Sequence, residues 1–222
     1  MYWVESLHWI VQDKISLDIS IDEFKYFFKN KQQKTSSSPS GRQLGHYKTI
    51  LECIRRDNYT AAEIIIKLAQ ISLLTASPLT RWQTASQVML GKGKGQFIEQ
   101  NRIIQLCKAD LNFILHVIWS HWLLRHAARH SGLKHSQYAL PGQTCHNAVL
   151  SKNLFLYLSW QSLSPGIFMD YDATAAFDRV LAGLSSVSSQ YLGLPRSAGM
   201  FMYSLLRDMK FHLITGFGLS VQ

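Results

Sequence analysis

The sequence predicts an α+β protein, rich in helices and built around a small sheet. Several stretches repeat their apolar residues with helical spacing, which favours amphipathic helices. Three short segments are rich in aliphatic side chains, as is typical of strands: residues 87–90, 102–106 and 211–215. Helices and strands follow each other without a strict strand–helix–strand period, so an α+β class is favoured over a parallel α/β fold.

The composition is that of a globular protein with a basic surface. The chain has 222 residues, of which 47% are hydrophobic and 17% charged, and is long enough to bury a full core. Its formal net charge is +9. This charge favours a polyanionic partner only weakly, because a basic surface that serves solubility has the same composition.

Cysteines, apolar stretches and the first residues suggest an intracellular protein. Three cysteines without a CxxC pair argue against a disulfide framework and a zinc knuckle. The most apolar stretch, residues 113–124, is too short and too polar to cross a bilayer, so no membrane partner is expected. Glu5 and His8 do not fit a signal peptide, and we expect a location in the nucleus or cytoplasm.

Two capping boxes predict the first helices. Ser20 and Glu23 have the spacing of a capping box and open a helix over residues 20–31, with Phe24, Phe27 and Phe28 on one face. Residues 32–40 are polar and predict a loop. Thr60 and Glu63 repeat the spacing and open a second helix. The stripe expected to be buried on this helix consists of Ile64, Ile65, Leu68, Ile71 and Leu74.

The middle of the chain predicts a hairpin and two more helices. Residues 87–90 and 102–106 form an expected two-stranded ribbon with a glycine-rich basic tip. Asp110 is expected to cap a long helix over residues 111–130, whose polar face carries arginines and histidines. After a turn-rich connection, residues 145–160 predict a further helix.

The last third alternates strands and helices. Residues 166–172 predict a buried strand that ends at Asp172, and a helix follows to about residue 192. Pro195 suits the first turn of the next helix, which runs to about residue 210. Residues 211–215 predict a strand, and residues 216–218 begin its turn.

Residues 168–180, FMDYDATAAFDRV, are the most informative stretch for function. Asp170 and Asp172 are two residues apart, so on a strand both carboxylates point to the same face and either can ligate a divalent metal. Phe177 follows Asp172 by five residues, where its ring can lie under the sugar of an incoming nucleotide. The alternative interpretation makes Asp172 a helix N-cap and Phe177 a core residue.

The spacing Asp-x4-Phe-Asp resembles the first catalytic motif of reverse transcriptases of the non-LTR retrotransposon and group II intron type. The resemblance implies an RNA-directed DNA polymerase that uses an RNA template, a DNA primer and deoxynucleoside triphosphates. It also implies that Asp172 binds the catalytic Mg²⁺ ions, with Asp170 as a neighbouring ligand. Phe177 would then exclude ribonucleotides by clashing with their 2′-hydroxyl.

The ribbon resembles the fingers hairpin of the same enzymes. By that match Lys92, or Lys94, and Arg102 contact the incoming triphosphate, which suits a point charge and a bidentate fork. Ile103 stands where the family commonly has a proline. A solvated, charged hairpin turn is the alternative interpretation of this segment.

Two further segments resemble parts of these polymerases. Residues 137–144, QYALPGQT, are similar to the motif that lies against the template, which makes Gln137, Gly142 and Gln143 template-binding candidates. Both arginines of the family motif are missing here. Residues 38–48, SPSGRQLGHYK, resemble a segment that precedes the fingers in retroelement polymerases and offer Arg42, His46 and Lys48 as donors.

The chain lacks part of the catalytic apparatus of that family. Two-metal nucleotidyl transfer needs more than one carboxylate, and no Asp-Asp pair occurs in the sequence. We therefore expect an N-terminal fragment comprising the fingers and partial palm of a right-hand polymerase, inactive alone. Its expected regions are a helical extension with a Ser/Gly-rich loop (residues 1–50), a fingers-like region (51–160) and a partial palm (161–222). The alternatives are a non-catalytic RNA- or DNA-binding remnant and a strand-poor helical scaffold.

Overall fold

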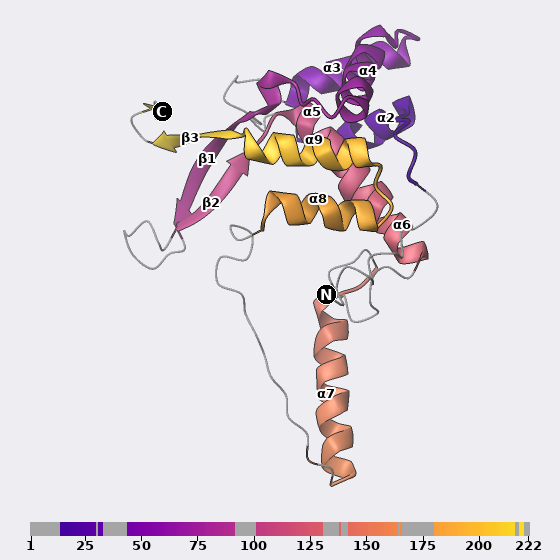
Figure 1. The fold of residues 1–222 in the computed structure, drawn as a ribbon, viewed down its shortest axis with the longest axis vertical. Helices are drawn as coiled ribbons and strands as arrows, with labels where there is room; N and C mark the ends of the chain where they lie inside the picture. The colour runs from indigo at the N-terminus through magenta and orange to yellow at the C-terminus, as the bar shows by residue number, and fades with distance from the viewer. Residues whose placement is uncertain are drawn as a thin grey trace.

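The computed structural model confirms the α+β class. It describes residues 14–29, 31–32, 44–91, 101–130, 138, 142–163, 165, 180–215 and 218–219. Within these ranges, most of the helices lie together beside a small mixed sheet (Figure 1). The four strands are short beside the helices, and the helical scaffold stays an untested alternative.

Most elements follow the order that the sequence predicts, but helix α3 was not predicted, and the predicted strand over residues 166–172 lies outside the described residues. The first part comprises α2 (Ile21–Lys29), α3 (Leu44–Arg55), α4 (Thr60–Leu74), the single turn η2 (Thr80–Trp82), β1 (Thr84–Gly91) and β2 (Asn101–Leu106). The second part comprises α5 (Ala109–Leu115), the π-helical segment η4 (His116–Leu123), α6 (Leu124–Arg129), α7 (Cys145–Gln161), α8 (Ala182–Tyr191), α9 (Arg196–Arg207), β3 (Lys210–Thr215) and β4 (Gly218–Leu219).

The sheet joins distant parts of the chain, in the order β2-β1-β3-β4. β1 and β2 pair antiparallel, which confirms the predicted ribbon. β3 lies parallel to β1 on its other side, and β4 pairs antiparallel with β3. A parallel pair requires a crossover connection, and here the chain between β1 and β3 contains helices α5 to α9.

Helix α2 confirms the first capping box. The Ser20 backbone N–H donates to the Glu23 carboxylate at 2.8 Å, and the Glu23 N–H donates to Ser20 Oγ at 3.3 Å. Phe24 and Phe28 are fully buried, and the Phe28 ring stacks on Tyr47 of α3 with centroids 4.7 Å apart. This aromatic cluster begins the core.

Helix α4 contradicts two predictions. Thr60 is its first helical residue: Tyr59 holds the N-cap position, and the Thr60 N–H donates to Asn58 Oδ1 at 3.3 Å. The predicted stripe is also on the wrong face: Ile64 and Ile71 are each 55% exposed, whereas the buried residues are Ala62, Ile66, Ala69, Ser72 and Leu73. Both faces are apolar, and the face with two alanines packs inward against α2 and α9 because small side chains let helices approach closely.

The long helix predicted over residues 111–130 is present as α5, η4 and α6, but Asp110 does not cap it. Lys108 occupies the cap position, and Asp110 lies within the first turn with 1% of its surface exposed. Its carboxylate pairs with Arg81 and accepts a hydrogen bond from Trp82 Nε1 at 2.9 Å. The residue thus forms a buried tertiary contact in place of a local one.

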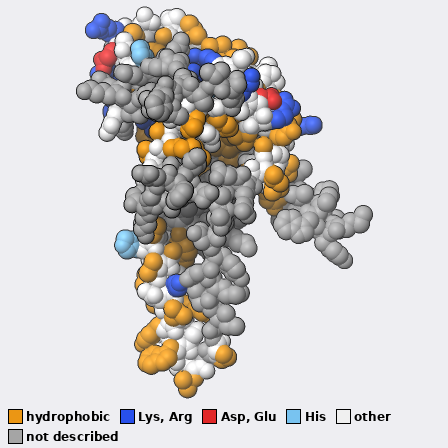
Figure 2. Space-filling view, turned by 90° about the vertical axis from the view of Figure 1, so that its left-hand side faces the viewer, with side chains coloured by type: hydrophobic (Ala, Val, Ile, Leu, Met, Phe, Trp, Pro, Cys, Tyr) orange, Lys and Arg blue, Asp and Glu red, His pale blue; other side chains and the backbone are white. Residues whose placement is uncertain are grey.

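Helix α7 forms as predicted but contacts little. Thr144 caps it by accepting the Asn147 N–H at 3.3 Å. None of its residues is buried, and it projects from the rest of the molecule (Figure 1). Figure 2 shows hydrophobic side chains at the surface of the lower part of the molecule, where α7 lies.

Helices α8 and α9 are joined by a tight turn and pack on each other. Ser186 Oγ donates to the Gly199 carbonyl at 2.7 Å, which links the two helices. Gly193, in the turn between them, has φ +103°, and a Cβ there would lie 2.5 Å from His126 Nε2. Only glycine meets both conditions.

One hydrophobic core includes residues from each of the three predicted regions. Phe24 and Phe113 meet with ring centroids 5.4 Å apart, and Phe201 of α9 lies 6.0 Å from Trp82. The proposed boundaries at residues 50 and 160 stay predictions. No helix of the described residues is both long and apolar enough to pass through a membrane.

Candidate nucleic-acid interface

The two strands of the predicted ribbon pair with each other. Leu90 pairs with Arg102, and Gly91 with Asn101, so residues 92–100 close the hairpin. Lys92 and Lys94 belong to this connection and lie outside the described residues, as does the side chain of Arg102. The backbone of the hairpin is therefore confirmed, and the triphosphate role of its cations stays a prediction.

A buried ion pair fixes the base of this hairpin. Arg81 and Trp82 immediately precede β1, and Asp110 follows β2 by four residues. The Asp110 carboxylate, which bonds to both of them, joins the chain entering the hairpin to the chain leaving it. Sequence reasoning missed this contact, because nothing local to Asp110 indicates a partner 29 residues away.

The predicted metal and sugar contacts lie outside the described residues. This holds for Asp170, Asp172 and Phe177, and also for Gln137 of the template segment. Among the residues that the structure does describe, no three His, Cys, Asp or Glu side chains come together as a metal site. The assignment of Mg²⁺ to the acids stays a prediction from the motif.

The described part of the template segment leads into α7. Gly142 has φ +85°, and no atom lies within 4 Å of where its Cβ would be, so the backbone is accessible there. Gln143 is exposed, and its side-chain oxygen accepts a hydrogen bond from Asn147 Nδ2 at 2.9 Å. These two residues are accessible to a ligand, and template contact stays a prediction.

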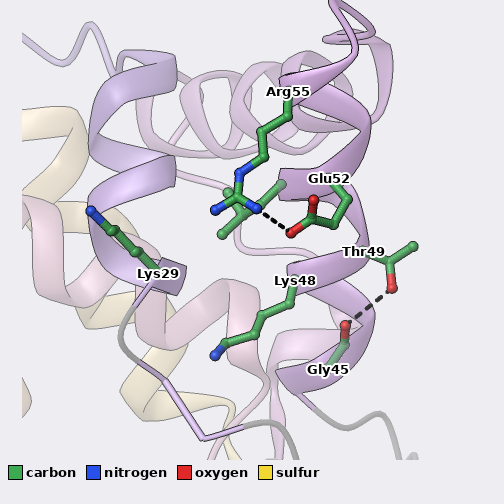
Figure 3. A pocket seen from close by; sticks show the side chains of 7 residues that line it. Lys29, Gly45, Lys48, Thr49, Glu52 and Arg55 are labelled. Atoms are coloured by element: carbon green, nitrogen blue, oxygen red, sulfur yellow. Dashed lines mark hydrogen bonds and ion pairs between the residues drawn. The ribbon is translucent and has the colours of Figure 1, made fainter.

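A pocket between α2 and α3 brings three cations together. It has a volume of about 330 Å³ and is lined by Lys29, Gly45, Lys48, Thr49, Leu51, Glu52 and Arg55. Lys48 and Arg55 extend from α3 toward α2, whose last residue is Lys29 (Figure 3). Sequence reasoning singled out Lys48 only. Lys29 and Arg55 join it through the packing of two helices, which no local pattern indicates.

The pocket has an excess of positive charge. Among the described residues that line it, Glu52 is the one acid, and its carboxylate accepts a hydrogen bond from Arg55 Nη1 at 2.7 Å. Neither Lys29 nor Lys48 has an ion-pair partner within the described ranges. Two ammonium groups are therefore available to an anion.

Two other hollows flank the π-helical segment. One of about 370 Å³ lies beside the end of β2 and includes Lys31 and His116. Burial lowers the pKa of His116, with further lowering from Lys31 and His121. The other, of about 410 Å³, sets Asp22 and Glu23 against His116, His121 and Arg125. Neither lining includes as many lysines and arginines as that of the α2–α3 pocket.

Comparisons with protein families and with curated proteins found no match, so a function for this chain is inferred from its own residues. No family model matches the chain. No curated protein resembles it at a significant level. The hairpin, the basic pocket and the motif around Asp172 are therefore the features from which a function is inferred.

Proposed function

We propose that this chain supplies the fingers and the first part of the palm of a reverse transcriptase of retroelement type. The complete enzyme would synthesise DNA on an RNA template by two-metal nucleotidyl transfer. The chain alone is inactive, because the sequence contains no Asp-Asp pair to complete the metal site.

The observation that carries the proposal is the hairpin. The Leu90–Arg102 pairing places Arg102 beside the end of β1, and the connection over residues 92–100 contains Lys92 and Lys94. Such a tip can close over a triphosphate, with lysine as a point charge and arginine as a bidentate donor. The Asp110 contact supports this role, since it joins the two chain segments at the base of the hairpin that carries these cations.

The remaining roles come from the motif over residues 168–180. Asp172, with Asp170 beside it, would hold Mg²⁺, which neutralises phosphate charge and lowers the pKa of the attacking hydroxyl. Phe177 would lie under the sugar and exclude a 2′-hydroxyl. Lys92 and Arg102 would stabilise the charge that develops on the leaving pyrophosphate.

The test is primer extension by a fusion. The chain is joined to the palm remainder of a retroelement polymerase that carries the paired aspartates, and DNA synthesis is measured on a primed RNA template with Mg²⁺. We expect extension by the fusion and none by either part alone. A folded fusion that binds template and primer but never extends the primer would refute the polymerase assignment.

A second candidate function is a non-catalytic remnant that binds RNA or DNA. The α2–α3 pocket favours it, because its lysines are accessible without any contribution from Asp172. Binding by this route is electrostatic and decreases steeply with salt. If the fusion fails to extend a primer while the chain still binds RNA, the remnant becomes the better description.

A further inference from the structure

The structure assigns the α2–α3 pocket as a binding site for the phosphate groups of a nucleic-acid strand. The inference rests on the proposal that the chain binds nucleic acid, but not on the catalytic role of Asp172 or on the hairpin. It concerns Lys29, Lys48 and Arg55, which come from two helices and line one hollow. Lys48 and Arg55 extend toward α2 (Figure 3).

The charges of the pocket select an anion. Lys29 and Lys48 each present an ammonium group that no described carboxylate neutralises. Arg55 uses Nη1 to bond Glu52, and its other guanidinium N–H groups can still donate. With three cations and one carboxylate, the pocket favours a group that carries negative charge and accepts several hydrogen bonds, as phosphate does.

The size and lining of the pocket favour a strand over a free nucleotide. Its volume of about 330 Å³ is large enough to admit a phosphate group. None of the seven lining residues is aromatic, so the pocket offers no surface on which a base can stack. Contacts of this kind position a backbone and do not read its sequence.

The test uses the full chain and a fluorescein-labelled single-stranded RNA of about 20 nucleotides. Fluorescence anisotropy gives the affinity between about 50 and 200 mM salt. The test variant is Lys29→Gln with Lys48→Gln. The matched control is Lys14→Gln with Lys67→Gln, which removes the same charge from two exposed lysines that do not line the pocket.

The test variant and the control are expected to differ in how steeply RNA affinity depends on salt. If each pocket lysine neutralises one phosphate, the test variant reduces the slope of log K against log salt by about 1.4, at about 0.7 per single-strand phosphate. The control leaves the slope within about 0.3 of the starting value. Equal slopes for the two variants, or no RNA binding by the unmodified chain at the lowest salt, would overturn the assignment.

A third variant strengthens the test, because it predicts tighter binding. Glu52→Gln removes the acidic lining residue and frees Arg55, so the affinity for RNA should rise about two- to fivefold. Loss of structure cannot produce such a gain, and an unchanged or weaker affinity counts against the site.

Competition separates a strand from a free anion. Inorganic phosphate at equal ionic strength should displace RNA no better than chloride does. If phosphate competes specifically, and its effect disappears in the Lys29/Lys48 variant, the pocket binds single anions and the strand assignment is wrong. Primer extension by the fusion is a separate measurement, so failure of the polymerase role and failure of this site are distinguishable.

Discussion

Helices α2 and α7 were both predicted from the sequence, yet only α2 buries its apolar residues. α2 has nine residues and buries Phe24, Phe27 and Phe28, whereas α7 has seventeen and buries none. The apolar residues of α2 share one face, while those of α7 are distributed around the helix. The comparison shows that a helix can be predicted without knowing whether its surface is covered.

The largest expected difference in stability between the two helices comes from a pair of alanine substitutions. Phe28 is fully buried against rings of α2, α3 and α5, so Phe28→Ala should lower the free energy of unfolding by about 3–5 kcal/mol. Leu154 on α7 is 51% exposed. Leu154→Ala should therefore change the free energy of unfolding by less than about 0.5 kcal/mol. Urea denaturation gives both values. A loss above about 2 kcal/mol for Leu154→Ala would mean that α7 is covered in solution.

A second test concerns the contact that joins the ends of the hairpin. Asp110→Ala leaves the Trp82 N–H buried without its acceptor and Arg81 without its carboxylate, which should cost about 2–3 kcal/mol. Part of the Arg81 side chain can be rehydrated, since 37% of it is exposed. Glu52→Ala, which breaks a surface pair, is the control and should cost less than about 1 kcal/mol. Similar losses in the two variants would show that the buried pair adds nothing.

The smallest effect distinguishes the two predicted capping boxes. Ser20→Ala removes an acceptor for the Glu23 N–H and should destabilise the protein by about 1 kcal/mol. Thr60→Ala removes no cap, so its effect should be a few tenths of a kcal/mol at most. Thermal unfolding of both variants compares them directly. Equal losses would restore Thr60 as a cap.

Local patterns predicted the fold better than they predicted its contacts. The Ser20 box, the hairpin and β3 depend on neighbouring residues, and all three formed as expected. The buried face of α4 could not be predicted, because Ile64, Leu68 and Ile71 oppose an equally apolar face that contains Ala62 and Ala69. The choice between them depends on how closely other helices approach.

The candidate site shows the same division. The two strands of the hairpin were predicted from short aliphatic segments, but its base depends on the long-range Asp110–Arg81 pair. The α2–α3 pocket combines Lys29 with Lys48, which no sequence spacing connects. Asp172 and Phe177 were predicted from a motif, and their arrangement stays a prediction.

The most direct measurement of the polymerase proposal is primer extension by the fusion with two aspartate substitutions compared. Asp172→Asn removes the proposed metal ligand, and Asp178→Asn alters the acid that follows Phe177, to which no metal role is assigned. Extension should decrease by at least about a hundredfold for Asp172→Asn, since even outer partners of metal ligands contribute up to that much, and should be retained by Asp178→Asn. Full extension by Asp172→Asn would contradict the metal role of Asp172.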